Sequence, residues 1–252
     1  MKRNIPQEIL PLKALQEFTA ARIGLGRVGT SIPLKQALEF KLAHAHARDA
    51  VYSELDINSL TDLLKLFGLP VLHLQSRVGY REQYLQRPDM GRRLNKESID
   101  LLQQGYYVET DIAVIIVDGL SATAVNKNSP ELLRVLIPQL TAAGFKLAPI
   151  SLVEQGRVAI GDDIGHGLKA KLSLILIGER PGLSSADSLG VYLTYGPKPG
   201  LTDEARNCVS NIRPGGLSYA EATKKIFYLI SEAFKRKSSG VMLKDNAGLL
   251  ES

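Results

Sequence analysis

The chain has 252 residues, of which 44% are hydrophobic and 23% charged, a composition typical of a globular protein with one substantial core. No apolar run reaches the roughly 18 residues of a membrane span, and the N-terminus lacks a signal-peptide pattern, so we expect an intracellular protein that does not bind membranes. The net charge of +5 is spread along the chain without a recognisable nucleic-acid motif, so we expect no nucleic-acid binding. The one cysteine, Cys208, excludes an internal disulfide and a thiolate metal cage.

The first third of the sequence is predicted to be mainly helical. Apolar residues recur at helical spacing over residues 34–55. Ser59 followed by Asp62 resembles a capping box, which would begin a short helix that ends at Gly68. Residues 71–74 are compatible with a short strand.

After Asn95 the pattern changes to alternating strands and helices. Asn95 is expected to cap a helix that runs to Gln104, and Ser218 with Glu221 forms a capping box for a later helix. Ser129, Pro130 and Glu131 together predict the start of a helix that ends at Gly144. Expected strands cover residues 112–117, 147–153, 172–177 and 191–195.

This alternation predicts an α/β fold: a mostly parallel sheet with helices on both faces, preceded by a helical N-terminal segment. We divide the chain into residues 1–94, a helical segment that ends in an arginine-rich loop, and residues 95–252, which form the α/β domain. Ligands of such sheets bind beyond the carboxyl ends of the strands. The segments expected there are 118–122, 154–163 and 178–189.

Two of these segments carry candidate ligand contacts. Glu179 and Arg180 form an ionisable pair between glycines at the end of an expected strand. The pair is interpreted either as part of a ligand site or as a salt-bridged turn. Residues 118–121 allow the same two interpretations. The arginine-rich residues 87–93 form either a solvated turn or a loop that anchors a partner or an anionic ligand.

Other motifs favour ordinary structural roles. Residues 24–29 match the dinucleotide fingerprint G-x-G-x-x-G, but they follow a helical stretch instead of a strand, which favours a connector. His44 and His46 point to different sides of a helix and cannot share a metal ion. A helix boundary explains Asp162 and Asp163 better than a metal or acid–base cluster with a nearby histidine does. Cys208 by itself reads as a small buried residue.

Seven strings taken together resemble one family, the small (light) subunit of ethanolamine ammonia-lyase. They occur in the family's order over nearly the whole chain. The strings are residues 21–29, 46–51, 87–94, 118–121, 156–158, 178–183 and 208–212.

The resemblance implies a subunit of an adenosylcobalamin-dependent lyase that deaminates ethanolamine to acetaldehyde and ammonia by a radical mechanism. In this family a large subunit carries the substrate site, and the small subunit has a Rossmann-like sheet. Cobalamin lies between the two, so the chain is expected to be active only in the complex. The family also implies six large and six small subunits, in the bacterial cytoplasm, either free or inside the ethanolamine-utilisation microcompartment.

Three cobalamin-contacting positions of the family fall on Val158, Glu179 and Cys208. All three lie in residues 95–252, so the resemblance implies that this domain binds cobalamin. Glu179 is expected to accept hydrogen bonds from the corrin amides, Val158 to pack against the cofactor, and Cys208 to add soft or backbone contacts. None of them is expected to ligate cobalt, and no catalytic residue or metal ligand is expected in this chain. The alternative is a non-catalytic Rossmann-like protein that binds nucleotides or polyanions.

Overall fold

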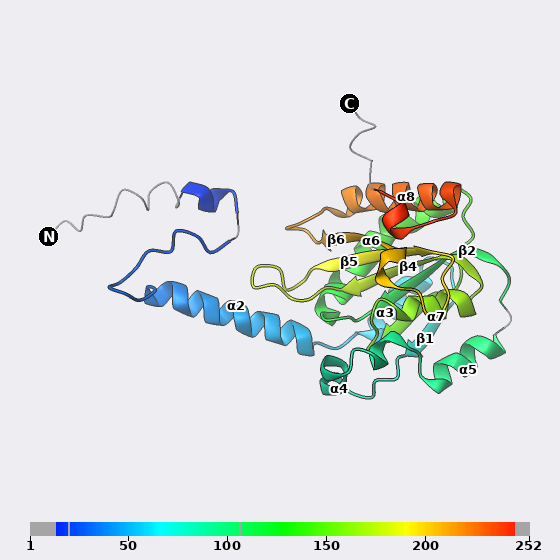
Figure 1. Cartoon of the computed structure of the whole chain (residues 1–252), viewed down its shortest axis with the longest axis horizontal. Helices are drawn as coiled ribbons and strands as arrows, with labels where there is room; N and C mark the ends of the chain where they lie inside the picture. The colour runs from blue at the N-terminus through cyan, green and yellow to red at the C-terminus, as the bar shows by residue number, and fades with distance from the viewer. Residues whose placement is uncertain (1–13, 20, 106, 245–252) are drawn as a thin grey trace, which may run out of the picture.

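The computed structural model describes residues 14–19, 21–105 and 107–244, which form a six-stranded sheet with helices on both sides and a helical arm (Figure 1). The strand order is β1-β3-β2-β4-β5-β6. The strands are β1 (Val71–Gln75), β2 (Thr110–Val117), β3 (Ile150–Glu154), β4 (Ala170–Gly178), β5 (Leu189–Tyr195) and β6 (Arg206–Ile212). The first four in this order pair in parallel, whereas β5 and β6 are antiparallel to their neighbours.

Side chains of β2 alternate between two hydrophobic cores, as the period of a strand requires. Ile112, Val114 and Ile116 pack with helices α3 (Ile57–Lys65), α6 (Ala122–Ala142) and α8 (Tyr219–Arg236). Ala113, Ile115 and Val117 face α5 (Lys96–Gln104) and α7 (Ile160–Gly167). The expected α/β sheet with helices on both faces is therefore confirmed. The sheet also takes β1 from the segment 1–94, which is not purely helical.

Two helix starts agree with the sequence and two do not. Asn95 caps α5 by accepting the Ser98 N–H at 2.8 Å, and Ser218 with Glu221 forms the capping box of α8. The prediction for α3 was wrong by one turn, because Asp56 caps it and Ser59 is the residue whose N–H donates, at 3.1 Å. The helix expected to begin at Ser129 begins instead after its cap Ser121.

Several elements had no distinct sequence signal. These are the antiparallel edge strand β6, the short helix α4 (Arg81–Gln86), and the 3-10 turns at Leu15–Glu17, Met90–Arg92, Asp203–Ala205 and Gly240–Met242. A buried ion pair fixes β6 against α7: Arg206 donates to both carboxylate oxygens of Asp162, at 2.8 and 2.9 Å. Such a pair stays charged without water because each charge satisfies the other.

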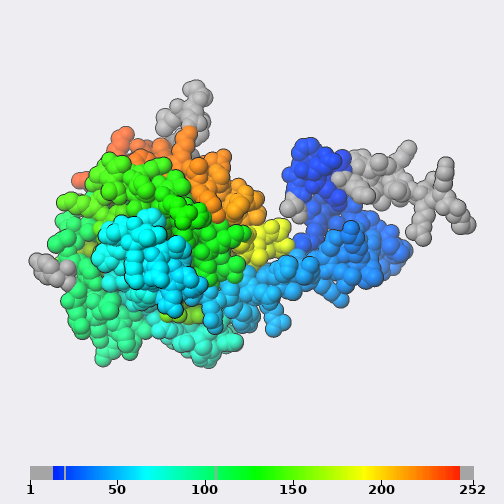
Figure 2. Space-filling model, turned by 180° about the vertical axis from the view of Figure 1, so that it is seen from behind, coloured from blue at the N-terminus to red at the C-terminus, as the bar shows by residue number. Residues whose placement is uncertain are grey.

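The N-terminal part of the chain extends away from the sheet as an arm, defined here as residues 14–19 and 21–52 (Figures 1 and 2). Its main element is α2 (Leu34–Tyr52), in which Ala50 alone is buried. In the part of the chain that the structure describes, no helix combines the length and apolarity that crossing a membrane requires.

Candidate ligand site at the carboxyl ends of the parallel strands

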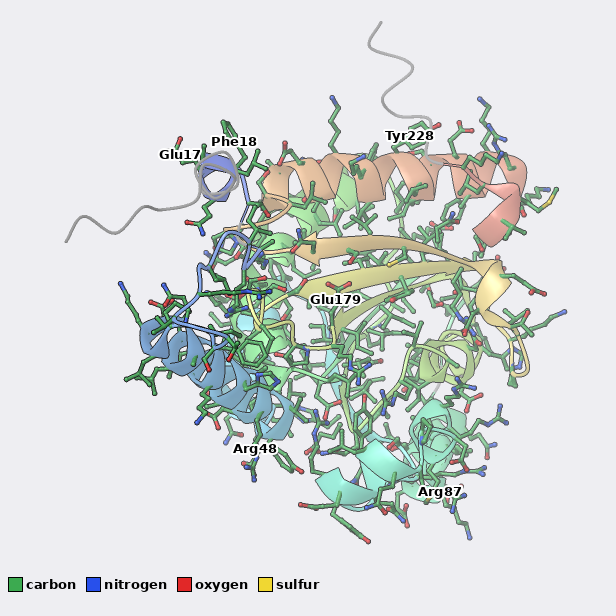
Figure 3. The ribbon with its side chains drawn as sticks, turned by 60° about the vertical axis from the view of Figure 1, so that its left-hand side comes forward. Glu17, Phe18, Arg48, Arg87, Glu179 and Tyr228 are labelled. Carbon is green, nitrogen blue, oxygen red and sulfur yellow. The ribbon has the colours of Figure 1, made fainter. Side chains whose placement is uncertain are left out.

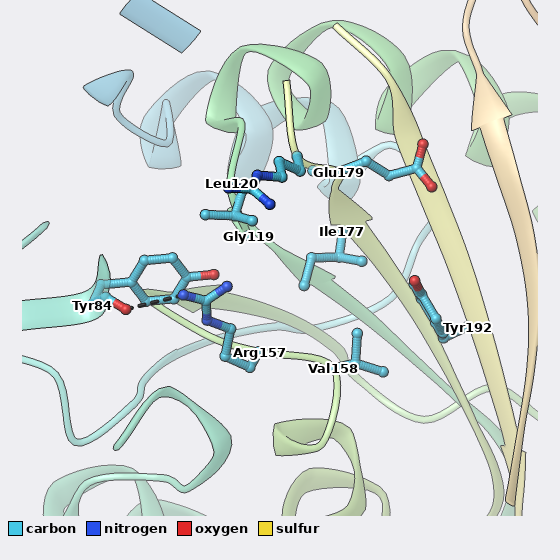
Figure 4. A pocket seen from close by; sticks show the side chains of 10 residues that line it. Tyr84, Gly119, Leu120, Arg157, Val158, Ile177, Glu179 and Tyr192 are labelled. Atoms are coloured by element: carbon cyan, nitrogen blue, oxygen red, sulfur yellow. Dashed lines mark hydrogen bonds between the residues drawn. The ribbon is translucent and has the colours of Figure 1, made fainter. Parts of the chain in front are cut away.

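A cavity of about 470 Å³ opens where the central parallel strands end (Figure 4). Its walls come from α4, from the segments that follow β2 and β3, from the end of β4, and from β5. The lining residues are Tyr84, Gly119, Leu120, Arg157, Val158, Ile177, Gly178, Glu179, Arg180 and Tyr192. The cavity thus lies at the sheet edge where the ligand segments were expected.

Glycines allow the ends of β2 and β4 to approach each other beneath this cavity. Gly119 has a φ of +59°, and a Cβ there would collide with the Gly178 carbonyl oxygen. A Cβ on Gly178 would in turn collide with the backbone of Ser121. Only glycine fits both positions, so the two segments form one narrow floor.

Glu179 fastens the rim of the cavity to the antiparallel strands. Its carboxylate accepts hydrogen bonds from the Ser188 and Ser210 hydroxyls and from the Asn211 N–H at 3.1 Å. A carboxylate offers about four acceptor positions. Three are used by the protein, which leaves about one unused. No ion pair joins Glu179 and Arg180 within the described chain, which disfavours the salt-bridged turn.

Val158 lines the cavity, whereas Cys208 lies one strand beyond it. Val158 also packs against the core between the sheet and α7. Cys208 is opposite Tyr192 in the β5–β6 register, one strand beyond the lining residues. Although the residue as a whole is exposed, burial of its sulfur raises the pKa of the Cys208 thiol. Cys208 is therefore not the buried core residue that its type alone suggested.

Tyr84 and Arg157 form the opposite wall, with Arg81 also stacked on the Tyr84 ring, and no local sequence signal predicted this group. The Cζ atoms of Arg157 and Arg81 lie 3.9 and 4.5 Å from the centroid of the Tyr84 ring, within the range of cation–π attraction. Arg157 also donates to the Tyr84 carbonyl at 3.0 Å, and the Tyr84 hydroxyl donates to the Gly156 carbonyl at 2.9 Å. Burial raises the pKa of Tyr84, so this hydroxyl stays a donor.

Asp118 holds the segments that follow β2 and β3 together from below. Its buried carboxylate accepts the backbone N–H groups of Gly119, Gln155 and Gly156 at 2.8, 2.9 and 3.1 Å. Burial raises the pKa of Asp118 to about 6, although these hydrogen bonds and the nearby Arg81, at 3.5 Å, act in the opposite direction.

The remaining candidates lie outside the cavity. Asp162 and Asp163 lie in the first turn of α7, where Asp162 pairs with Arg206 and Asp163 lies 3.3 Å from Arg93. The start of a helix therefore accounts for both aspartates, as the sequence favoured. His44 and His46 are exposed on α2, and residues 24–29 form a connector in the arm. Among the described residues, no group of three or more His, Cys, Asp or Glu could hold a metal ion.

The fold and the cavity define an α/β protein with a candidate ligand site at the carboxyl ends of its parallel strands. The site combines apolar side chains with a few charged ones, the usual composition of a site for an organic ligand.

Comparison with known proteins identifies the family. Residues 10–244 match the model of the family "Ethanolamine ammonia-lyase light chain (EutC)". The small subunit of ethanolamine ammonia-lyase from Azotobacter vinelandii is 52% identical over 250 residues, which cover 98% of this chain and 93% of that protein. The corresponding small subunits of Pseudomonas putida and Ralstonia nicotianae are each 50% identical, with 98% and 94% of this chain and 92% and 89% of those proteins covered. The chain belongs to the ethanolamine ammonia-lyase light chain family, as the resemblance indicated.

Proposed function

We propose that the chain is the small subunit of an adenosylcobalamin-dependent ethanolamine ammonia-lyase and that its cavity holds one part of the cofactor against a large subunit. The observation that carries the cofactor assignment is the position of Val158, Glu179 and Cys208. Of these three residues, expected from the family to contact cobalamin, Val158 and Glu179 line one cavity at the carboxyl ends of the parallel strands, and Cys208 lies on the next strand, opposite the lining residue Tyr192. Family membership supports the lyase and the large-subunit partner.

The cavity has the chemistry that a corrin ring and its amide side chains require. Leu120, Val158 and Ile177 offer apolar contacts to the ring. Glu179 can accept from amide N–H groups, and the two guanidinium groups of Arg157 and Arg180 can donate to amide carbonyls. The buried Nε of Arg157 has no hydrogen-bond partner among the described residues, which leaves a donor for a ligand.

The size of the cavity favours a shared site. A volume of about 470 Å³ suits a small ligand and is too small for a whole corrinoid with its nucleotide tail. The rest of the cofactor would lie against the large subunit. When bound, adenosylcobalamin supplies the cobalt–carbon bond whose homolysis starts the radical deamination of ethanolamine.

In this proposal the residues of the chain bind and shield; they do not react. The Asp118 hydrogen bonds and the Tyr84 stack fix the floor and one wall, and Glu179 fixes the rim, so the cofactor is oriented and water is excluded from one side. Ethanolamine would bind to the large subunit, in an assembly of six large and six small subunits. We place this assembly in the bacterial cytoplasm, free or inside a microcompartment, and describe the domain at residues 95–252 as Rossmann-like.

The test is acetaldehyde release from ethanolamine by the chain mixed with its cognate large subunit, with and without adenosylcobalamin. We expect product only when both chains and the cofactor are present, and none from this chain alone. A folded pair that releases no acetaldehyde would overturn the proposal. Salt-sensitive nucleotide or polyanion binding without any cobalamin spectrum would favour the alternative, a non-catalytic binding protein.

A further inference from the structure

Helix α2 in the arm carries two different stripes on nearly opposite sides. Ala43, Ala47 and Ala50 are turned inward, half-buried or buried. Leu34, Leu38 and Leu42, spaced four residues apart, are 74%, 55% and 56% exposed. We call these three the leucine stripe. A helix that packs only within its own chain usually buries its larger apolar side chains, so α2 has the reverse of the expected arrangement.

The surroundings of the leucine stripe indicate the charge of what covers it. Lys41 lies on the helix at one side of the stripe and is exposed, whereas Lys35 at the other side lies 3.9 Å from the Glu39 carboxylate. A groove with an apolar floor and an acidic group facing Lys41 fits this surface. Phe18, 84% exposed, adds a further apolar side chain to the arm (Figure 3).

Two hydrogen bonds join the arm to the cavity. The Arg22 guanidinium donates to the Leu183 carbonyl at 3.3 Å, in the segment that follows Glu179. At the other end of the arm, Arg81 donates to the Val51 carbonyl at 2.7 Å and to the Gly119 carbonyl of the cavity lining at 2.9 Å. The arm therefore lies beside the rim of the cavity, and a partner that covers the cavity would also meet α2.

We infer that the leucine stripe of α2 is a docking surface for the large subunit, which receives it in an apolar groove with an acidic group facing Lys41. This inference rests on the proposed function. The arm from residue 14 onward lies inside the range 10–244 that the family model matches, so it belongs to the part of the chain shared with other small subunits. Anchors at four-residue spacing are the usual way in which one helix occupies a groove.

The test is the affinity of the full-length chain for the large subunit, measured without cofactor by sedimentation. Leu38→Asp places a charge in the middle of the stripe and should weaken the association at least tenfold. Leu38→Ala keeps the helix and should weaken it less, in the same direction. The matched control is Leu66→Asp at the end of α3, where the leucine is 79% exposed, and it should leave the affinity within about twofold.

Three results would overturn the inference. In the first, Leu38→Asp binds the large subunit as tightly as the unaltered chain. In the second, the unaltered chain self-associates and Leu38→Asp only abolishes that, with binding to the large subunit unchanged. In the third, the unaltered chain fails to bind the large subunit. This result also overturns the proposed function, and it differs from a failure of the docking inference alone because it appears without any change in the arm.

Discussion

At the scale of single residues, Glu179 combines two roles that substitution can separate. Its carboxylate ties the end of β4 to β5 and β6 through three donors and keeps one acceptor position free. Glu179→Gln turns an amide NH₂ toward one or more of these donors and should lower the free energy of unfolding by about 1–2 kcal/mol. In the assembled enzyme it should also weaken cobalamin binding about tenfold or more, measured by the cofactor's absorbance spectrum.

Ser210→Ala is the control for Glu179. It removes one donor to the carboxylate and leaves the carboxylate itself in place, so it should cost about 1 kcal/mol of stability with little change in cofactor affinity. If Glu179→Gln binds cobalamin as tightly as the unaltered chain, Glu179 acts only on the structure of the rim.

Asp118 should make the stability depend on pH in the direction opposite to most carboxyl groups. Its pKa is about 6 in the folded protein because of burial, above the value of about 3.9 expected in the unfolded chain. The folded state therefore binds the proton more tightly. This contribution is fully present below about pH 4 and is lost as the pH rises through 6, and its size is about 3 kcal/mol.

Urea denaturation of the Asp118→Asn variant at pH 4 and at pH 7 measures this contribution. The stability of the unaltered chain relative to the variant should be greater at pH 4 than at pH 7, by up to about 3 kcal/mol. Asp89→Asn is the control, because Asp89 is exposed and the pKa of its carboxyl is lowered by Arg87. A relative stability that is equal at the two pH values, or greater at pH 7, would contradict the assignment to Asp118.

At the scale of elements, Ser121 connects the start of α6 to the rim of the cavity. Its buried hydroxyl accepts the Ala124 N–H at 3.2 Å and donates to the Ala186 carbonyl at 2.9 Å. Ser121→Ala removes both hydrogen bonds without access for water, so unfolding should become easier by about 1–2 kcal/mol, seen as a lower urea midpoint at constant slope. Ser218→Ala, at the exposed cap of α8, should cost less. An unchanged midpoint for Ser121→Ala would show that the cap contributes nothing.

The same helix shows which parts of the fold the sequence could predict. Local signals sufficed where side chain and backbone are neighbours, as for the caps Asn95 and Ser218. Ser129 and Pro130 imitate a helix start, but α6 continues through them because both are buried against the sheet, and the Ser129 hydroxyl bonds back to the Val125 carbonyl at 2.7 Å. Tertiary burial thus overrode a local signal.

Part of the candidate site could likewise be predicted from the sequence, and part could not. Glu179 and the segments after β2 and β3 were predictable, because strand ends in parallel sheets mark ligand sites. The wall formed by Tyr84 and Arg157 was not, because it depends on contacts between residues 72 to 74 positions apart in the chain, as in the hydrogen bonds of Tyr84 with Gly156 and of Arg81 with Gln155. Contacts at such separation leave no periodicity in a single sequence.

At the scale of the whole molecule, the cooperative folding unit should exclude most of the arm. No residue before Leu55 belongs to either hydrophobic core or packs against one in the described structure. The sheet, in contrast, requires β1, since Leu74 is part of the core and the strand pairs with β3 along its whole length. We therefore predict that the boundary of the folding unit lies near the end of α2, before residue 94.

Removal of residues 1–46 tests this boundary. The shortened chain keeps Val51, whose carbonyl accepts a hydrogen bond from Arg81. The shortened chain should unfold in one transition, with a free energy within about 1 kcal/mol of the full chain, because only exposed or half-buried side chains of the described arm are lost. Urea denaturation followed by circular dichroism measures it. A broad transition, or a midpoint far below that of the full chain, would show that the arm is part of the folding unit.

The same shortened chain separates folding from assembly. If it keeps its stability but no longer associates with the large subunit, then the arm serves assembly, and its leucines are exposed in the free chain because they are buried only in the complex.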